Sequence, residues 1–181
     1  MDRRQRKTRN AVFTAFTELI SKKDIDKITV AEIIEKADIG RATFYAHFET
    51  KDFLLKELCR ELFCHVFDVK AGNTHKHIFE CNDTDTVFLH ILKHLQKNDN
   101  NILALLSSRN NGLFLEYFRA ELEKLIKSEL YLFEERKTCP LPDGLWGRHI
   151  ASVFLDTVNW WIESGMKESP EQICQYFYKL V

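Results

Sequence analysis

Apolar residues recur every three or four positions along almost the whole chain, and sustained alternation with a two-residue period is absent. A period of three to four places apolar side chains on one face of a helix, whereas a strand needs a period of two. The pattern therefore predicts an all-α fold. Helices are expected at about residues 4–22, 30–37, 41–48, 51–70, 85–97, 101–106, 113–133, 143–164 and 170–180.

Capping residues indicate where some of these helices begin. Thr29 is followed three positions later by Glu32, and Ser169 by Gln172. This is the spacing of a capping box, in which two side chains satisfy free backbone amides at the start of a helix. The second and third helices are separated by a turn at residues 38–40, where Gly40 is expected to take the backbone angles of the tight corner.

The chain divides into a small head and a larger body. We expect an N-terminal head over residues 1–50, a connecting helix over 51–70 and a helical body over 71–181, with the first linker at 71–74. Residues 1–51 hold eleven Lys or Arg against eight Asp or Glu, whereas the rest of the chain has a net charge of −4. A basic head on an acidic body indicates a polyanionic partner for the head.

Composition excludes several classes of protein. A hydrophobic fraction of 45% and a charged fraction of 29% are typical of soluble globular chains. No apolar run approaches the ~20 residues of a membrane-spanning helix, and the basic N-terminus leads into no apolar segment of a secretory signal. Five cysteines without a C-x-x-C pair are expected to be reduced thiols. We therefore expect a cytoplasmic protein that has no membrane partner.

The two short helices around the turn at 38–40 have the dimensions of a helix-turn-helix. In that motif the second helix packs one face on the core and presents the other to a DNA major groove. At 100° per residue, Phe44 and Phe48 share the buried side of the helix at 41–48. The other half and the flanks carry side chains that can reach phosphates or base edges, namely Arg41, Ala42, Thr43, Tyr45, Ala46 and His47.

The sequence Ala-Asp-Ile-Gly-Arg-Ala-Thr-Phe-Tyr-Ala-His-Phe at 37–48, followed by Lys-Asp-Phe-Leu-Leu at 51–55, closely resembles the signature of TetR-family (tetracycline-repressor-like) regulators. Where those regulators usually have glycine and serine, this chain has Asp38 and Gly40. The resemblance implies a homodimeric transcriptional regulator, usually a repressor, that binds a pseudo-palindromic operator in double-stranded DNA. The DNA contacts that it implies are Thr29, Arg41, Ala42, Thr43, Tyr45, His47 and Lys51.

The C-terminal part of the chain carries a second, shorter resemblance. Residues 161–171 follow the pattern W-x-x-x-G-M-x-x-S-P-E, which is similar to a branch of the family that includes the activator of a dihydroxyacetone-kinase operon. The resemblance implies a homodimer through the last two helices, at 143–164 and 170–180, and an effector that is a small molecule or a protein. Apolar content indicates interface candidates, which are His149, Ile150, Val153, Phe154, Trp160, Ile173 and Phe177.

Aromatic residues of the body allow two interpretations: they line a cavity for an apolar effector, or they fill the core, which helical spacing favours. The pocket candidates are Phe88, Phe114, Tyr117, Phe118, Trp146 and Trp160. The adjacent pair Trp160 and Trp161 points about 100° apart on a helix. If one faces the core, we therefore expect the other to face a partner helix.

The sequence carries two histidines at a metal-binding spacing and no motif typical of an enzyme. His90 and His94 stand four residues apart on a predicted helix, a spacing that can chelate a metal, and His75, His77 and Cys81 are near in sequence. No H-E-x-x-H motif is present, so we expect ordinary surface histidines, no metal and no cofactor. No nucleophile–base group, phosphate loop or paired-carboxylate motif occurs, so we do not expect an enzyme.

Overall fold

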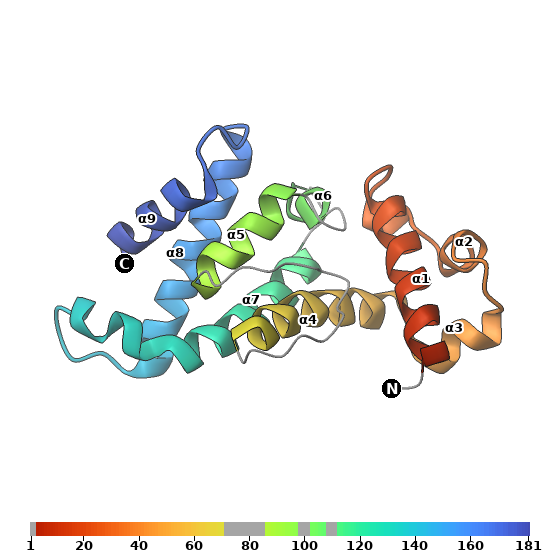
Figure 1. Cartoon of the computed structure of the whole chain (residues 1–181), viewed down its shortest axis with the longest axis horizontal. Coiled ribbons are helices and arrows are strands. Elements are labelled where there is room, and N and C mark those ends of the chain that lie inside the picture. Colours follow the sequence, from red (N-terminus) through yellow and green to blue (C-terminus); the bar gives the residue numbers. More distant parts are fainter. Residues whose placement is uncertain (1–2, 71–85, 98–101, 108–111) are drawn as a thin grey trace.

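The fold is helical in all the residues that the structure describes. The structure is a computed structural model that describes residues 3–70, 86–97, 102–107 and 112–181 (Figure 1). These ranges contain helices and no strand, as the sequence predicts. The linker expected at 71–74 and the residues His75, His77 and Cys81 lie outside these ranges. The elements are α1 (Arg3–Ile20), η1 (Ile25–Lys27), α2 (Val30–Lys36), α3 (Arg41–His47), α4 (Lys51–Lys70), α5 (Val87–Lys97), α6 (Ile102–Ser107), α7 (Gly112–Glu129), η3 (Leu130–Arg136), α8 (Asp143–Glu163) and α9 (Pro170–Leu180).

Side-chain caps mark the starts of three helices. At α2 the Thr29 hydroxyl accepts a hydrogen bond from the backbone amide of Glu32, whose carboxylate accepts one from the amide of Thr29. Ser169 and Gln172 form the same arrangement at α9. The Thr50 hydroxyl accepts a hydrogen bond from an amide in the first turn of α4 (3.0 Å). Both capping boxes predicted from the sequence are therefore confirmed.

The turn between α2 and α3 differs from the expectation. Gly40 has a φ of −74°, which any residue adopts, and it serves as the N-cap residue of α3. Asp38 instead takes the left-handed conformation, with a φ of 50°. Aspartate tolerates this conformation better than most residues because its short polar side chain bonds the local backbone. The tight corner is therefore made by Asp38, and the expectation for Gly40 was wrong.

The apolar period does not predict the two 3-10 helices, η1 and η3. η1 lies between α1 and α2 and is only three residues long. The helix expected to end at Phe133 ends as an α-helix at Glu129 and continues as η3 to Arg136. A 3-10 helix needs only i→i+3 bonds and is commonly found at the ends of α-helices.

The head is formed by α1, α2 and α3 and lies at one end of the molecule (Figure 1). α1 packs against α2, and α2 packs against α3. The ring of Phe48 lies 5.5 Å from that of Phe13 on α1 and 5.7 Å from that of Phe44, measured between centroids. All three rings are fully buried, so an aromatic core fixes α3 against α1.

The body is a stack of helices that α4 joins to the head. α4 packs along α7, α7 packs on α8, and α9 contacts both α5 and α8 (Figure 1). The ring centroid of Phe88 on α5 lies 4.9 Å from Phe177 of α9 and 5.5 Å from Phe154 of α8, so aromatic packing joins these three helices. α6 contacts α1 as well as α8, which adds a second link between head and body. No helix among the described residues has the length and apolar character needed to cross a membrane.

Candidate nucleic-acid interface

α3 has one face in the core and one face in solvent. Phe44 is fully buried against the head. Except for His47, which is half-buried, the residues expected to contact DNA from this helix are exposed, and they are Arg41, Ala42, Thr43 and Tyr45. The structure therefore brings together on one surface the α3 side chains that the sequence assigned to one site.

Aromatic contacts organise the exposed face of α3. The ring of Tyr45 packs edge-on against buried Phe44, with centroids 5.4 Å apart and an interplanar angle of 87°. The Arg41 guanidinium lies 5.5 Å from the centroid of the Tyr45 ring, a cation–π distance. A buried residue thus orients an exposed tyrosine, which in turn orients an arginine. Such preorganisation reduces the side-chain entropy lost on binding.

Thr29 is exposed at the start of α2, and its hydroxyl already has partners. It donates a hydrogen bond to the carboxylate of Glu32 (2.9 Å). The Lys23 ammonium also pairs with this carboxylate, and that bond, followed by the bonds from Thr29, holds the pKa of Glu32 down at about 2. Glu32 is therefore ionised at neutral pH, and a phosphate bound by Thr29 would compete with it for the hydroxyl hydrogen.

Lys51 lies at the head with different partners from those expected. Its ammonium donates to the backbone carbonyl oxygens of Ile25 (2.8 Å), Ile28 (3.1 Å) and Asp26 (3.5 Å). An ammonium has three hydrogens to donate, and these carbonyls match them in number. Lys51 therefore ties the start of α4 to η1 and the residue that follows it, a role that the sequence did not indicate.

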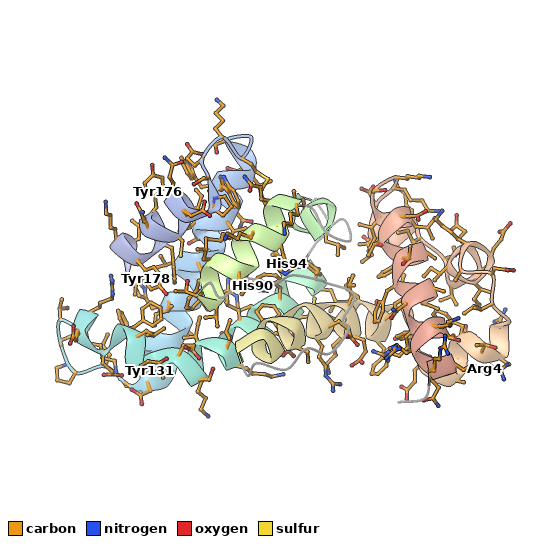
Figure 2. All side chains as sticks on the ribbon, in the orientation of Figure 1. Arg4, His90, His94, Tyr131, Tyr176 and Tyr178 are labelled. Carbon is orange, nitrogen blue, oxygen red and sulfur yellow. The ribbon has the colours of Figure 1, made fainter. Side chains whose placement is uncertain are left out.

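Basic side chains of α1 continue this surface. Arg3, Arg4, Arg6 and Lys7 are exposed in the first turns of α1. Figure 2 shows Arg4 at the end of α1 that lies beside α3, in agreement with the contact between Phe13 of α1 and the end of α3. Asp38 is exposed in the turn before α3, so a negative charge stands close to the start of that helix.

Comparison with known proteins assigns both parts of the chain. Residues 13–58 match the family described as bacterial regulatory proteins, tetR family, and residues 82–181 match the family described as transcriptional regulator C-terminal region. The chain belongs to the TetR family. A TetR transcriptional regulator from Streptococcus agalactiae 2603V is 35% identical, with a TM-score of 0.73 over 99% of this chain and 96% of that one.

Two curated relatives come from Bacillus subtilis (strain 168). The HTH-type transcriptional regulator YvdT is 33% identical over 64 residues, which are 35% of this chain and 33% of YvdT. The HTH-type transcriptional regulator YxbF is 21% identical over 186 residues, which cover 100% of this chain and 46% of YxbF. The chain thus spans less than half of the length of either relative. TetR-family proteins are transcriptional regulators, which agrees with the expectation that this chain is not an enzyme.

The pocket candidates of this TetR-family chain are spread over separate places. They are Phe88, Phe114, Tyr117, Phe118, Trp146 and Trp160. Phe88 lies in the aromatic cluster of α5, α8 and α9, whereas Phe114 and Phe118 pack on each other at 5.8 Å, and Phe118 lies 5.0 Å from Phe63 of α4. Tyr117 is half-buried. Phe88, Phe114 and Phe118 are therefore core residues, and they lie in two different regions of the core.

Trp146 differs from the other pocket candidates. Its ring is nearly buried and stacks on His149, with centroids 5.3 Å apart and an interplanar angle of 17°. Its indole N–H is buried and has no hydrogen-bond partner among the residues that the structure describes. A buried donor without a partner costs about 1–3 kcal/mol, so this atom is a natural contact for a bound molecule.

A groove between α8 and α9 has a cavity volume of about 570 Å³. Trp160 lines it and is 48% exposed, whereas the adjacent Trp161 is fully buried, so the different directions predicted for these two side chains are confirmed. Sequence reasoning missed Tyr176 and Leu180, although both lie away from the buried stripe of α9. The lining residues are Val153, Asp156, Thr157, Trp160, Tyr176, Lys179 and Leu180.

Four of the interface candidates have no surface to offer a second subunit. Ile150, Phe154, Ile173 and Phe177 are fully buried within the single chain, because they face the body's own core. That part of the expectation was wrong. His149 is exposed, and Val153 is half-buried at the groove.

His90 and His94 are buried, which corrects the expectation of surface histidines. Their Nε2 atoms lie 3.1 Å apart on α5, a hydrogen-bond distance in which one ring donates and the other accepts (Figure 2). The described residues contain no group of three or more His, Cys, Asp or Glu that could hold a metal ion. The pair is thus a buried polar contact within the body.

Proposed function

We propose that this chain binds a pseudo-palindromic operator in double-stranded DNA as a homodimer and represses transcription until an effector releases it. The observation that carries the proposal is the orientation of α3, with Phe44 fully buried in the head while Thr43 and Tyr45 are exposed. A helix held by its apolar face in this way can enter a major groove. The match of residues 13–58 to the tetR family supports the same function.

Within this proposal, the residues of the interface have different roles. Ala42 and Thr43 lie at the centre of the exposed face, where a small side chain permits close approach and a hydroxyl can bond a base edge. Arg41, Tyr45 and His47 contact bases or phosphates at its edges. Thr29 contacts a phosphate from the start of α2, and Arg3, Arg4, Arg6 and Lys7 add affinity that does not depend on sequence.

Lys51 is the seventh residue that the family resemblance assigned to DNA. Because carbonyl oxygens of Ile25 and Ile28 hold its ammonium at 2.8 and 3.1 Å, we assign it the role of holding the loop before α2. In this role Lys51 supports the DNA-binding surface and does not itself bind a phosphate.

The homodimer uses the outer faces of α8 and α9. Trp160 is 48%, Tyr176 40% and Leu180 64% exposed, although all three are large and apolar. The groove that they line also carries Asp156 and Lys179. In a two-fold contact each copy offers the same surface to the other, so a surface with both signs of charge can pair with itself. Such a dimer presents two α3 helices to two half-sites.

The effector is a small molecule bound in the body. Two separate features of the body support this role: the buried indole N–H of Trp146 on α8, which has no partner among the described residues, and the buried His90–His94 pair on α5. Ligand pockets are mostly apolar and carry a few polar groups of this kind. A thermal-shift screen of small polar organic compounds tests this role, because Trp146→Phe removes the N–H and should lose the shift that a true effector causes.

The branch that includes the dihydroxyacetone-kinase activator is a narrower placement within the family. The residues that carry this likeness build the corner between α8 and α9: Trp161 Nε1 donates to the carbonyl of Glu168 (2.9 Å), and Gly165 and Met166 have φ values of 80° and 53°. The likeness therefore supports a shared corner. It carries no argument for a protein effector, which is the alternative to a small molecule.

The proposal is tested by enriching duplexes that bind the wild-type chain from a random DNA pool. A homodimer with one α3 helix per half-site predicts a two-fold symmetric sequence, with half-site centres about one helical turn or a multiple of it apart. Enrichment of no sequence, or of a single asymmetric site bound by one chain, contradicts the proposal.

A further inference from the structure

Arg9 differs from the other basic residues at the start of α1. Arg3, Arg4, Arg6 and Lys7 are exposed, whereas only 12% of the Arg9 side chain is exposed. Its guanidinium turns inward to the junction of the head with α4. The basic residues within 3–9 therefore differ in role: four are exposed to solvent, and Arg9 contacts other parts of the chain.

On α4 the Arg9 guanidinium pairs with two carboxylates one turn apart. Its Nη2 donates to Glu57 Oε2 (3.0 Å) and to Glu61 Oε1 (3.2 Å). The side chain of Glu57 is 11% exposed and that of Glu61 is 26% exposed. A carboxylate so little exposed is costly to leave without a cation, so this contact resists opening.

The same guanidinium also contacts the end of α3, the helix that we propose enters the major groove and that we call the recognition helix. Its carbon lies 5.3 Å from the ring centroid of Phe13 and 5.3 Å from that of Phe48, the residue that ends α3. Phe48 in turn lies 5.7 Å from Phe44, the buried residue at the centre of α3. One side chain thus joins α1, α3 and α4.

Glu57 has a second cation that serves as an internal comparison. Arg60 Nη1 lies 3.2 Å from Glu57 Oε1, but Arg60 is three residues away on the same helix, and 61% of its side chain is exposed. Arg60 therefore neutralises the same carboxylate without connecting two helices. Of these two cations that pair with Glu57, Arg9 is the one that belongs to the head.

We propose that Arg9 is a positioning residue that sets the orientation of α3 relative to α4, and that Glu57 and Glu61 are its anchors. This inference rests on the proposed binding to operator DNA. α4 packs along α7 of the body, so the orientation of α3 on α4 determines where each recognition helix of a dimer lies. A specific complex needs both helices in register with two half-sites, whereas contacts to phosphates on random DNA tolerate a rotated head.

The test compares binding to the enriched operator and to random duplex at two salt concentrations. Arg9→Lys keeps the charge but loses the planar guanidinium, whose Nη2 donates to both carboxylates while its carbon lies 5.3 Å from the ring centroids of Phe13 and Phe48. It should weaken operator binding about tenfold, within the range for coupled contacts, and leave random-duplex affinity and the salt slope unchanged. Arg60→Ala should leave the operator preference unchanged. Arg6→Ala should weaken both duplexes alike and lower the salt slope by about one.

Glu61→Gln and Glu57→Gln distinguish most clearly between an effect of charge and a positioning role. Each removes a negative charge from a DNA-binding chain, so charge alone predicts tighter binding to both duplexes. A positioning role predicts weaker binding to the operator and no loss on random DNA. Glu61 is the more exposed anchor, so its variant remains informative if Glu57→Gln melts below the assay temperature, which far-UV circular dichroism establishes.

Three results of the binding test overturn the inference: operator affinity unchanged in Arg9→Lys, equal losses on operator and random DNA, or tighter operator binding by Glu61→Gln. If the wild-type chain prefers no sequence, the proposed function fails. Hydrogen exchange then tests the orientation directly, because Arg9→Lys should speed exchange of α3 amides and leave α9 amides unchanged. Equal exchange in the two chains overturns the positioning role without reference to DNA.

Discussion

Lys51 illustrates how one side chain acquires a role that no local pattern shows. It stands at the start of α4, where a basic residue near a helix-turn-helix suggests a phosphate contact. Its nearest oxygen atoms are instead backbone carbonyls, at Ile25 (2.8 Å) and Ile28 (3.1 Å). These carbonyls lie more than twenty positions earlier in the chain, so the contact follows from tertiary packing and could not be predicted from spacing.

Replacing Lys51 by methionine tests this assignment. Lys51→Met keeps the aliphatic stem and removes all three donors, and loss of hydrogen bonds from a charged group should lower the free energy of unfolding by about 1.5–3 kcal/mol. Urea denaturation measures this change. Lys56→Met, on an exposed position of the same helix, is the control and should be nearly neutral. If Lys51→Met leaves the stability unchanged and lowers the salt slope for DNA binding by about one, Lys51 is a phosphate contact and this assignment is wrong.

The tryptophan pair shows what the sequence does predict at the level of a residue. Adjacent positions on a helix point about 100° apart, so Trp160 and Trp161 had to face different surroundings. The structure places Trp161 in the core, with its indole N–H bonded to the carbonyl of Glu168, and leaves Trp160 48% exposed. The angle follows from helical geometry. Which of the two is buried depends on how α8 rotates against its neighbours.

At the scale of elements, prediction succeeded where the signal is local and failed where it is not. The boxes Thr29–Glu32 and Ser169–Gln172 begin α2 and α9 as predicted, because a cap is read from four consecutive residues. The change from α7 to η3 at Glu129 carries no comparable signal. The sequence predicts the corner between α2 and α3 at Gly40, but Asp38 makes it in the structure.

The Asp38 corner yields a prediction about the helix-turn-helix. A β-branched residue is strained at a φ of 50°, so Asp38→Val should lower the free energy of unfolding by about 1–2 kcal/mol. Asp38→Gly should not lower it, because glycine adopts this conformation without strain. Thermal unfolding measures both variants. Asp24→Val, at an exposed residue with a φ of −55°, is the control; a loss as large as that of Asp38→Val contradicts the account.

At the scale of the whole molecule, burial separates residues that look alike in sequence. Phe154, Phe177 and Trp160 all qualify as apolar residues of the last two helices. The first two are fully buried against the body, with ring centroids 5.2 Å apart, whereas the third lines the groove on the outer surface. Helical period predicts that each helix has an apolar face. It does not predict which side of that face meets the chain's own core and which meets a partner.

The dimer is tested by placing a charge in this groove. A tryptophan at the centre of an interface commonly contributes 2 kcal/mol or more, so Trp160→Glu should weaken the dimer by about 30-fold or more. Sedimentation velocity at micromolar concentration should then show a monomer where the wild-type chain is a dimer. Leu132→Glu, at a 40% exposed residue on η3, is the matched control and should remain dimeric. A Trp160→Glu chain that dimerises like the wild type contradicts an interface through α8 and α9.

The central claim is that the exposed face of α3 chooses the operator, and the enrichment experiment tests it most directly when repeated with Thr43→Ala. Thr43 is exposed on α3 between Arg41 and Tyr45, whereas Thr138 is an exposed threonine of the body. The account predicts that Thr43→Ala enriches a sequence altered at the same position of both half-sites, with affinity for random DNA unchanged, and that Thr138→Ala enriches the wild-type operator. An unchanged operator, bound by Thr43→Ala with wild-type affinity, would contradict it.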